Sequence, residues 1–203
     1  MRDNQPLTHG EEIMPSAFDV LASDHQQVKR LLAQFEAAPA ASGVNDSLLA
    51  ARKKMAETLV IEESKHEAVE EMYFWPAVRK HLPDGDELAD KAIGQEQEGK
   101  RILAELDKLD AGSPEFDMLL GEFINAARDH IAFEETQVWP ALRAVMTETE
   151  AFDLGERLEQ GKKTAPTRPH PHTPPSPGVL KAAGPAAAAA DRARDAATGR
   201  GRA

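Results

Sequence analysis

Apolar residues recur at alternating steps of three and four in four long segments of the chain. The segments run over residues 16–38, 47–80, 87–109 and 114–145. This spacing is typical of one face of an amphipathic helix. Because short polar breaks join the segments, the pattern predicts an all-α, up-down-up-down four-helix bundle.

Local signals set the ends of these helices. Ser113, Pro114 and Glu115 combine an N-cap serine, a proline at the first helical position and an acidic first turn, so a helix should begin there. Thr147 and Glu150 have the spacing of a capping box, which predicts a short fifth helix through residue 158. The chain then divides into a flexible arm (1–14), the bundle (15–160) and a tail (161–203).

The tail differs from the bundle in composition. Residues 161–184 hold six of the fourteen prolines, and an alanine-rich stretch follows Pro185. Such a proline-rich segment is typical of a spacer, and a short alanine-rich helix is marginal in water. We therefore predict a mostly disordered C-terminal tail.

Charge is distributed unevenly between these parts. The tail carries eight Lys or Arg against two Asp, so the net charge of −11 leaves −17 on residues 1–160. A body this acidic repels phosphate backbones and anionic lipids, so we expect neither nucleic acid nor membrane as a partner. Cations fit better, and the tail could dock on an acidic protein through its arginines, Arg192, Arg194, Arg200 and Arg202.

Composition also limits the chemistry. The chain has no Cys, so a metal must be held by His, carboxylate, hydroxyl or carbonyl groups. No G-x-S-x-G or P-loop pattern occurs, which excludes the usual serine hydrolase and phosphate-loop signatures. The first fourteen residues lack a signal-peptide pattern and no run of about 18 apolar residues occurs, so we expect a cytoplasmic protein.

An internal repeat links the second and fourth helices. Residues 66–79, HEAVEEMYFWPAVR, and residues 130–143, HIAFEETQVWPALR, are identical at eight of fourteen positions. The shared pattern is H-x-A-x-E-E-x-x-x-W-P-A-x-R. It predicts that the bundle consists of two related helical hairpins.

The repeat spacing suits a metal site. A His and a Glu four residues apart on a helix are separated by about 6 Å of rise and about 40° of rotation, so both can reach one ion. This selects Glu70 and Glu134, whereas Glu71 and Glu135 point about 140° away, toward solvent or neighbouring helices. Pro76 and Pro140 should kink or end each helix, with the preceding tryptophans as plugs.

A third histidine strengthens this interpretation. His25 lies on the apolar stripe of the first helix, where a lone histidine is more often an ordinary core residue. Together with His66, His130 and two carboxylates it would require several buried charges, and no matching inward Lys or Arg is evident. Because unpaired buried charges cost several kcal/mol each, a bound metal is the simplest counter-charge.

The Asp24-His25 pair, the two HxxxEE segments and the acidic body resemble the hemerythrin-like HHE cation-binding family over about residues 16–160. The resemblance implies a carboxylate- and oxo-bridged pair of iron ions in the bundle core, with zinc or manganese less favoured. It also implies that the ligands are His25, His66, Glu70, His130 and Glu134.

The third helix departs from the family pattern, which usually has a histidine there. Aligning the leucines of that helix puts Glu96 in the place of the histidine, whereas a slip of one residue puts Gln97 there. Glu96 would give a harder, more anionic shell that favours Fe(III). We favour Glu96, and either residue argues against reversible oxygen carriage, which in this family uses a histidine-rich shell.

Three further side chains are candidates for supporting the ligands. Tyr73, Glu62 and Gln97 lie near the ligand face in the helical pattern. Packing is the simpler role for Tyr73, since the second repeat has Gln137 there, and a solvated charge is the simpler role for Glu62.

Three functions fit this sequence. The first is a di-iron protein that reacts with dioxygen or hydrogen peroxide, as a sensor or a catalase-like detoxifying enzyme. The second is non-catalytic metal binding or buffering at the same site. The third is a regulatory adaptor that acts through the basic tail.

Overall fold

The computed structural model describes residues 14–38 and 45–201, and every regular element in those ranges is helical. This confirms the all-α class. Apart from Met14, the predicted flexible arm lies outside the described residues.

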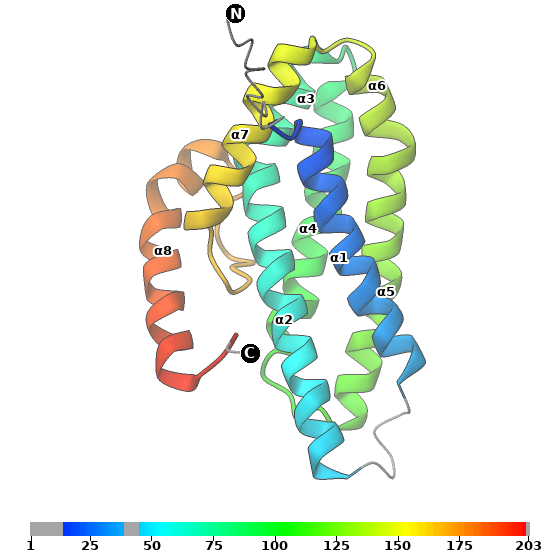
Figure 1. Cartoon of the computed structure of the whole chain (residues 1–203), viewed down its shortest axis with the longest axis vertical. Coiled ribbons are helices and arrows are strands. Elements are labelled where there is room, and N and C mark those ends of the chain that lie inside the picture. The colour runs from blue at the N-terminus through cyan, green and yellow to red at the C-terminus, as the bar shows by residue number, and fades with distance from the viewer. Residues whose placement is uncertain (1–13, 39–44, 202–203) are drawn as a thin grey trace, which may run out of the picture.

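Four long rods form the bundle and run side by side (Figure 1). The first rod is α1 (Ala17–Ala37) and the third is α4 (Gly85–Leu106). The second and fourth rods each consist of an α-helix, a five-residue π-helix and a shorter α-helix. They comprise α2 (Asp46–Val69), η1 (Glu70–Phe74) and α3 (Trp75–His81), and α5 (Pro114–Phe133), η2 (Glu134–Val138) and α6 (Trp139–Arg143).

The predicted helix starts are confirmed. Ser113 caps α5 by accepting a hydrogen bond from the Phe116 N–H, at 3.2 Å. Thr147 and Glu150 form a capping box at the start of α7 (Glu148–Thr164), which runs past the predicted end at residue 158. Side-chain caps of this kind satisfy backbone N–H groups that have no partner within the helix.

The core consists of two apolar clusters with a polar layer between them. One cluster surrounds Trp75, Trp139 and Leu142, at the end of the bundle where α7 crosses. The other surrounds Leu103 and Phe116. The predicted metal ligands lie close to where the two clusters meet on each rod, together with other buried polar residues such as Glu63 and Glu67.

The C-terminal segment differs from the prediction of a mostly disordered tail. Residues 177–198 form the helix α8 (Pro177–Thr198), which lies against the flank of the bundle (Figure 1). Arg168 and Arg200 both contact Asp107, at the end of α4, and Arg168 also pairs with Asp195 of α8 at 2.7 Å. Composition could not show these pairs, because their partners lie 27 to 93 residues apart in the chain.

Among the described residues, none of the helices combines the length and apolar character needed to cross a bilayer.

Candidate metal centre

Six side chains from all four rods converge in the polar layer. They are His25 of α1, His66 and Glu70 of the second rod, Glu96 of α4, and His130 and Glu134 of the fourth rod, each at most 8% exposed. All six were predicted as ligands from the sequence, and the structure brings them together.

These residues form two overlapping groups, each with ligand atoms within 4.8 Å of one another. We define position A as the group His25, His66, Glu70 and Glu134. Position B is the group Glu70, Glu96, His130 and Glu134. Because both groups contain Glu70 and Glu134, these two carboxylates lie where they could bridge a pair of cations.

The imidazole Nε2 atoms point into this space. His25 Nε2 lies 3.3 Å from Glu134 Oε2, His66 Nε2 lies 3.2 Å from Glu70 Oε2, and His130 Nε2 lies 2.9 Å from Glu134 Oε1. None of these contacts has hydrogen-bond geometry, and the three Nε2 atoms have no hydrogen-bond partner among the described residues.

The carboxylate oxygens of the site also lack hydrogen-bond partners among the described residues. Both oxygens of Glu70 and of Glu134, and Oε2 of Glu96, are buried without a hydrogen-bond partner in the described part of the chain. A buried polar atom without a partner costs free energy, and native structures rarely keep so many in one place. Bound cations would satisfy all of them, so the residues present fit a dinuclear metal site.

The other nitrogen of each imidazole is held by a neighbouring side chain. His25 Nδ1 lies 3.0 Å from Glu135 Oε1, and His66 Nδ1 lies 3.3 Å from Asp24 Oδ2. His130 Nδ1 lies 3.2 Å from Gln95 Oε1. An acceptor at Nδ1 fixes the tautomer that leaves Nε2 free to bind a metal, as is usual for metal-ligating histidines.

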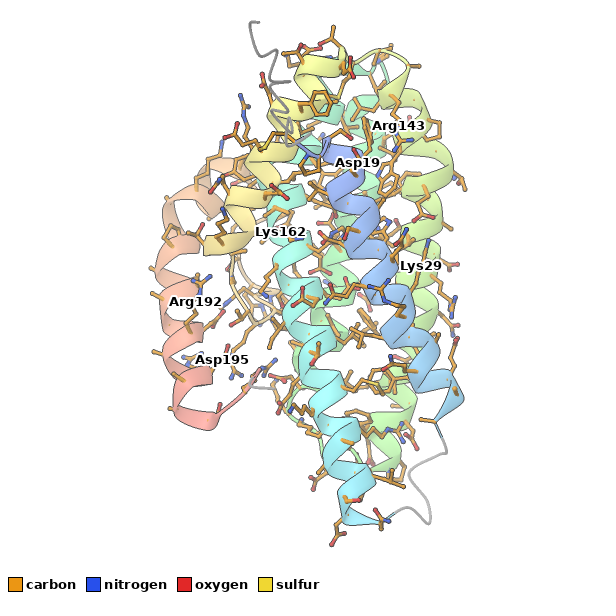
Figure 2. The ribbon with its side chains drawn as sticks, viewed as in Figure 1. Asp19, Lys29, Arg143, Lys162, Arg192 and Asp195 are labelled. Carbon is orange, nitrogen blue, oxygen red and sulfur yellow. The ribbon has the colours of Figure 1, made fainter. Side chains whose placement is uncertain are left out.

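Two of these acceptors are tied in turn to lysines nearer the surface. Lys29 of α1 contacts both oxygens of Glu135 at 2.7 Å. Lys162, in the last turn of α7, pairs with Asp24. Figure 2 shows Lys29 on α1 and Lys162 on α7. The bundle thus balances the acceptor carboxylates with its own lysines, whereas the carboxylates at positions A and B have no such partner in the described structure.

Titration behaviour reflects this missing counter-charge. Burial raises the pKa of Glu70 and of Glu96 well above the usual range, and neighbouring carboxylates raise it further. Burial also acts to raise the pKa of Glu134, but the charges of His130 and His25 outweigh it and hold that pKa below its usual value. A cation at either position would favour the ionised form of all three carboxylates.

Comparison with known proteins finds a family match for more than half of this chain. The family profile described as hemerythrin HHE cation binding domain matches residues 16–142. The chain belongs to the hemerythrin HHE cation-binding family. A protein of Schizosaccharomyces pombe, named an uncharacterized hemerythrin-like protein, is 31% identical over 137 residues, which are 67% of this chain and 68% of the relative.

A solved structure supports the fold. The crystal structure of a hemerythrin HHE cation binding domain-containing protein from Mycobacterium kansasii superposes with a TM-score of 0.58 and 24% identity. The match covers 74% of this chain and 89% of that one. The profile match and the 31% identical relative confirm the family resemblance drawn from the HxxxEE repeats.

In this HHE domain the α-helix gives way to a π-helix just before each of the two prolines. Each HxxxE motif runs into a π-helix, in which the Trp75 and Trp139 N–H groups donate to the Glu70 and Glu134 carbonyls five residues earlier. A proline ring clashes with the carbonyl four residues before it in a regular α-helix. The wider turn accommodates Pro76 and Pro140, so both rods continue past them.

The two tryptophans close one side of the site, as predicted. Trp139 stacks on the His25 ring, with centroids 4.8 Å apart and an interplanar angle of 16°. Trp75 donates its indole N–H to Glu96 Oε1. Both tryptophans therefore restrict the orientation of a candidate ligand.

The structure distinguishes the two alternatives on the third helix. Glu96 joins position B. Gln97 instead donates to Glu71 Oε1 at 2.9 Å. The same oxygen lies 2.6 Å from Lys100 Nζ. Glu71 and Glu135 both face a neighbouring helix, which is one of the two predicted environments.

Two predicted supporting residues lie away from the ligands. Tyr73 packs against Gly161 of α7, and Lys181 Nζ lies 5.3 Å from its ring centroid. Glu62 pairs with Lys65 at 3.1 Å and is half-buried. Tyr73 therefore has the packing role and Glu62 the role of a surface charge, the simpler of the roles expected for each.

Sequence reasoning did not assign Asp24, Gln95 or Glu135 to the site. Each of them is adjacent in sequence to a predicted ligand. Side chains of adjacent helical residues diverge by about 100°, so a residue beside one ligand reaches a ligand on the next helix. Asp24 precedes His25 but contacts His66 for this reason.

A small cavity adjoins the site. His25, His66 and His130 line it together with Glu63 and the apolar residues Val28, Ala127 and Ile131. Its volume is about 10 Å³, roughly the minimum for one water-sized molecule. A small molecule there would lie next to three of the candidate ligands.

Proposed function

We propose that this HHE domain holds two iron ions at positions A and B and reacts with dioxygen or hydrogen peroxide. The observation that carries the proposal is the pair of overlapping ligand groups that share Glu70 and Glu134. The reaction would serve either to sense the oxidant or to remove it in a catalase-like manner.

The ligand chemistry supports iron. The set combines three imidazoles with three carboxylates, and mixed imidazole and carboxylate ligands suit iron. Iron would supply the redox chemistry by changing between its ferrous and ferric states. The three carboxylates also offset part of the charge of two cations.

The protein would limit which molecules reach the metals. The candidate ligands are buried, and the adjoining cavity accommodates one very small molecule. Glu63 lines this cavity and is 6% exposed. Burial, reinforced by the charges of Glu134 and Asp24, raises the pKa of Glu63 to about 8 in the metal-free chain. In the metal-free chain this carboxyl therefore holds a proton beside the cavity at neutral pH.

The direct test is the response of the iron-loaded protein to an oxidant. Protein loaded with Fe(II) without oxygen should change its visible absorption when air or hydrogen peroxide is added. A catalase-like role further predicts release of oxygen from peroxide, measured with an oxygen electrode. Glu134→Ala should remove both responses, whereas the matched control Glu62→Gln should keep them. An iron-loaded wild type whose spectrum does not respond to either oxidant would refute the proposal.

Metal buffering remains the alternative, and exchange rates separate it from redox chemistry. A buffer must release its metal readily, but six ligands that are at most 8% exposed favour slow exchange. Release of iron to a chelator within seconds, without any spectral response to peroxide, would favour buffering.

A further inference from the structure

The two metal positions of this site are not equivalent. Besides the shared carboxylates, position A has two imidazoles, from His25 and His66. Position B has one imidazole, from His130, and the carboxylate of Glu96. Position B is therefore the harder and more anionic of the two.

The surroundings of Glu96 orient its carboxylate without neutralising it. The indole N–H of Trp75 donates to Glu96 Oε1, so the carboxylate is oriented from the side opposite its free oxygen. Lys100, one helical turn further along α4, is buried at 7% exposure and pairs with Glu71 at 2.6 Å. The positive charge of Lys100 is therefore taken up by Glu71, and Glu96 keeps an uncompensated carboxylate for a cation.

Position A has no glutamate ligand besides the two shared carboxylates, although Glu63 lines the cavity next to its histidines. Its two histidines are held by Asp24 and Glu135, whose charges are paired with Lys162 and Lys29. Trp139 covers the His25 ring. The two positions thus differ in ligand type and also in the groups that surround the ligands.

We propose that the two positions select different metals, with iron at position A and manganese competing effectively with iron at position B. Imidazole favours iron over manganese, whereas carboxylate oxygens suit manganese. Iron generally binds more tightly than manganese at any one site. The expected result is therefore a higher manganese fraction at position B than at position A, not an excess of manganese over iron. The proposal rests on the two-ion site of the proposed function, because it requires both positions to hold ions; with iron as the only metal supplied, both positions hold iron.

The test uses the full chain and the two metals alone. Metal-free protein is incubated without oxygen in equal excesses of Fe(II) and Mn(II), and unbound metal is removed. Total metal is then measured, and diffraction at the iron and manganese absorption edges locates each element. We expect two ions per chain, with the manganese fraction several-fold higher at position B than at position A. Equal fractions at the two positions, or manganese enriched at position A, would overturn the proposal.

Substitution of Glu96 checks the cause. Glu96→His gives both positions two imidazoles. The manganese fraction at position B of the mixed-metal sample should then fall several-fold, toward the fraction at position A. Glu62→Gln should leave the ratio unchanged. If Glu96→His does not fold, the distribution of the two metals in the wild type still decides the question. Fewer than two ions in the wild type would instead refute the dinuclear centre itself.

Discussion

At the scale of single residues, the shared carboxylates should matter more than any ligand of one position. Glu134 belongs to both ligand groups, whereas His66 belongs to position A alone. We expect Glu134→Ala to lose both ions and His66→Ala to keep about one ion per chain. Elemental analysis of the purified, metal-loaded variants measures this. Equal metal loss in the two variants would contradict the bridging role of Glu134.

The residues that hold the imidazoles should tune metal affinity without being ligands. Asp24→Asn and Glu135→Gln each remove a negative charge at a histidine Nδ1 while keeping the shape of the side chain. Loss of such a supporting group typically lowers metal affinity about 10–100-fold. Competition with a chelator of known affinity measures the change. Glu62→Gln, whose partner is Lys65 on the same helix, should retain wild-type affinity.

Stability should depend on pH and on metal. In the metal-free chain the folded-state pKa of Glu63 is about 8, above its usual value of 4.5. Burial also raises the pKa of Glu70 and of Glu96. The folded chain therefore binds more protons than the unfolded chain between these values, so its stability falls as pH rises through this window.

Metal binding should oppose that loss. A cation favours the ionised carboxylates, so metal-loaded protein should retain stability where the metal-free chain loses it. We expect the difference in melting temperature between the two forms to grow from about pH 5 to about pH 8. Calorimetry on both forms measures it. A difference that shrinks over this range would be inconsistent with buried carboxylates that lack counter-charge.

At the scale of helices, the sequence was sufficient for the bundle and for the candidate ligands. Apolar spacing and caps such as Ser113 located the helices, because both act over a few neighbouring residues. The repeated HxxxE motifs selected Glu70 and Glu134. The π-helices were not foreseen, because a proline predicts disruption of a helix without specifying how the backbone accommodates it.

These π-helices should affect metal binding. Pro140→Ala removes the ring that a regular α-helical turn cannot accommodate, so the backbone from Glu134 to Val138 could return to α-helical geometry. The change would alter the orientation of Glu134 relative to Trp139. We expect unchanged helix content by circular dichroism and a several-fold lower metal affinity. Unchanged affinity would mean that the π-helix does not orient the ligand.

At the scale of the whole molecule, the C-terminal segment is part of the folded structure. It covers a cavity of about 50 Å³ lined by Ser64, Glu71 and Lys100 on the bundle side. Thr167, Arg168 and Arg200 bind Asp195 or Asp107. Arg192 donates to the carbonyls of residues 163 and 165. Arg192 and Arg200, two of the four arginines predicted to meet an acidic partner, therefore have partners within the chain.

Asp107 is the main anchor of this segment, because both oxygens lie 2.6 Å from Arg200 Nη1. Asp107→Asn should weaken the docking of the C-terminal segment by about one or two kcal/mol. The fraction of molecules in which this segment is undocked would then rise about 5–30-fold. Limited proteolysis should then cleave residues 165–177 faster, while the melting temperature of the bundle changes little. Arg194→Ala, at an exposed position of α8, is the matched control. Equal cleavage of both variants would show that Asp107 does not anchor the segment.

The central claim is that the two overlapping ligand groups hold two metal ions. X-ray diffraction from crystals of the iron-loaded protein, collected at the iron edge, tests it most directly. The predicted result is two anomalous peaks flanked by Glu70 and Glu134, one beside His25 and His66 and the other beside Glu96 and His130. Peaks elsewhere on the protein, or a single peak that none of the shared carboxylates contacts, would contradict the account.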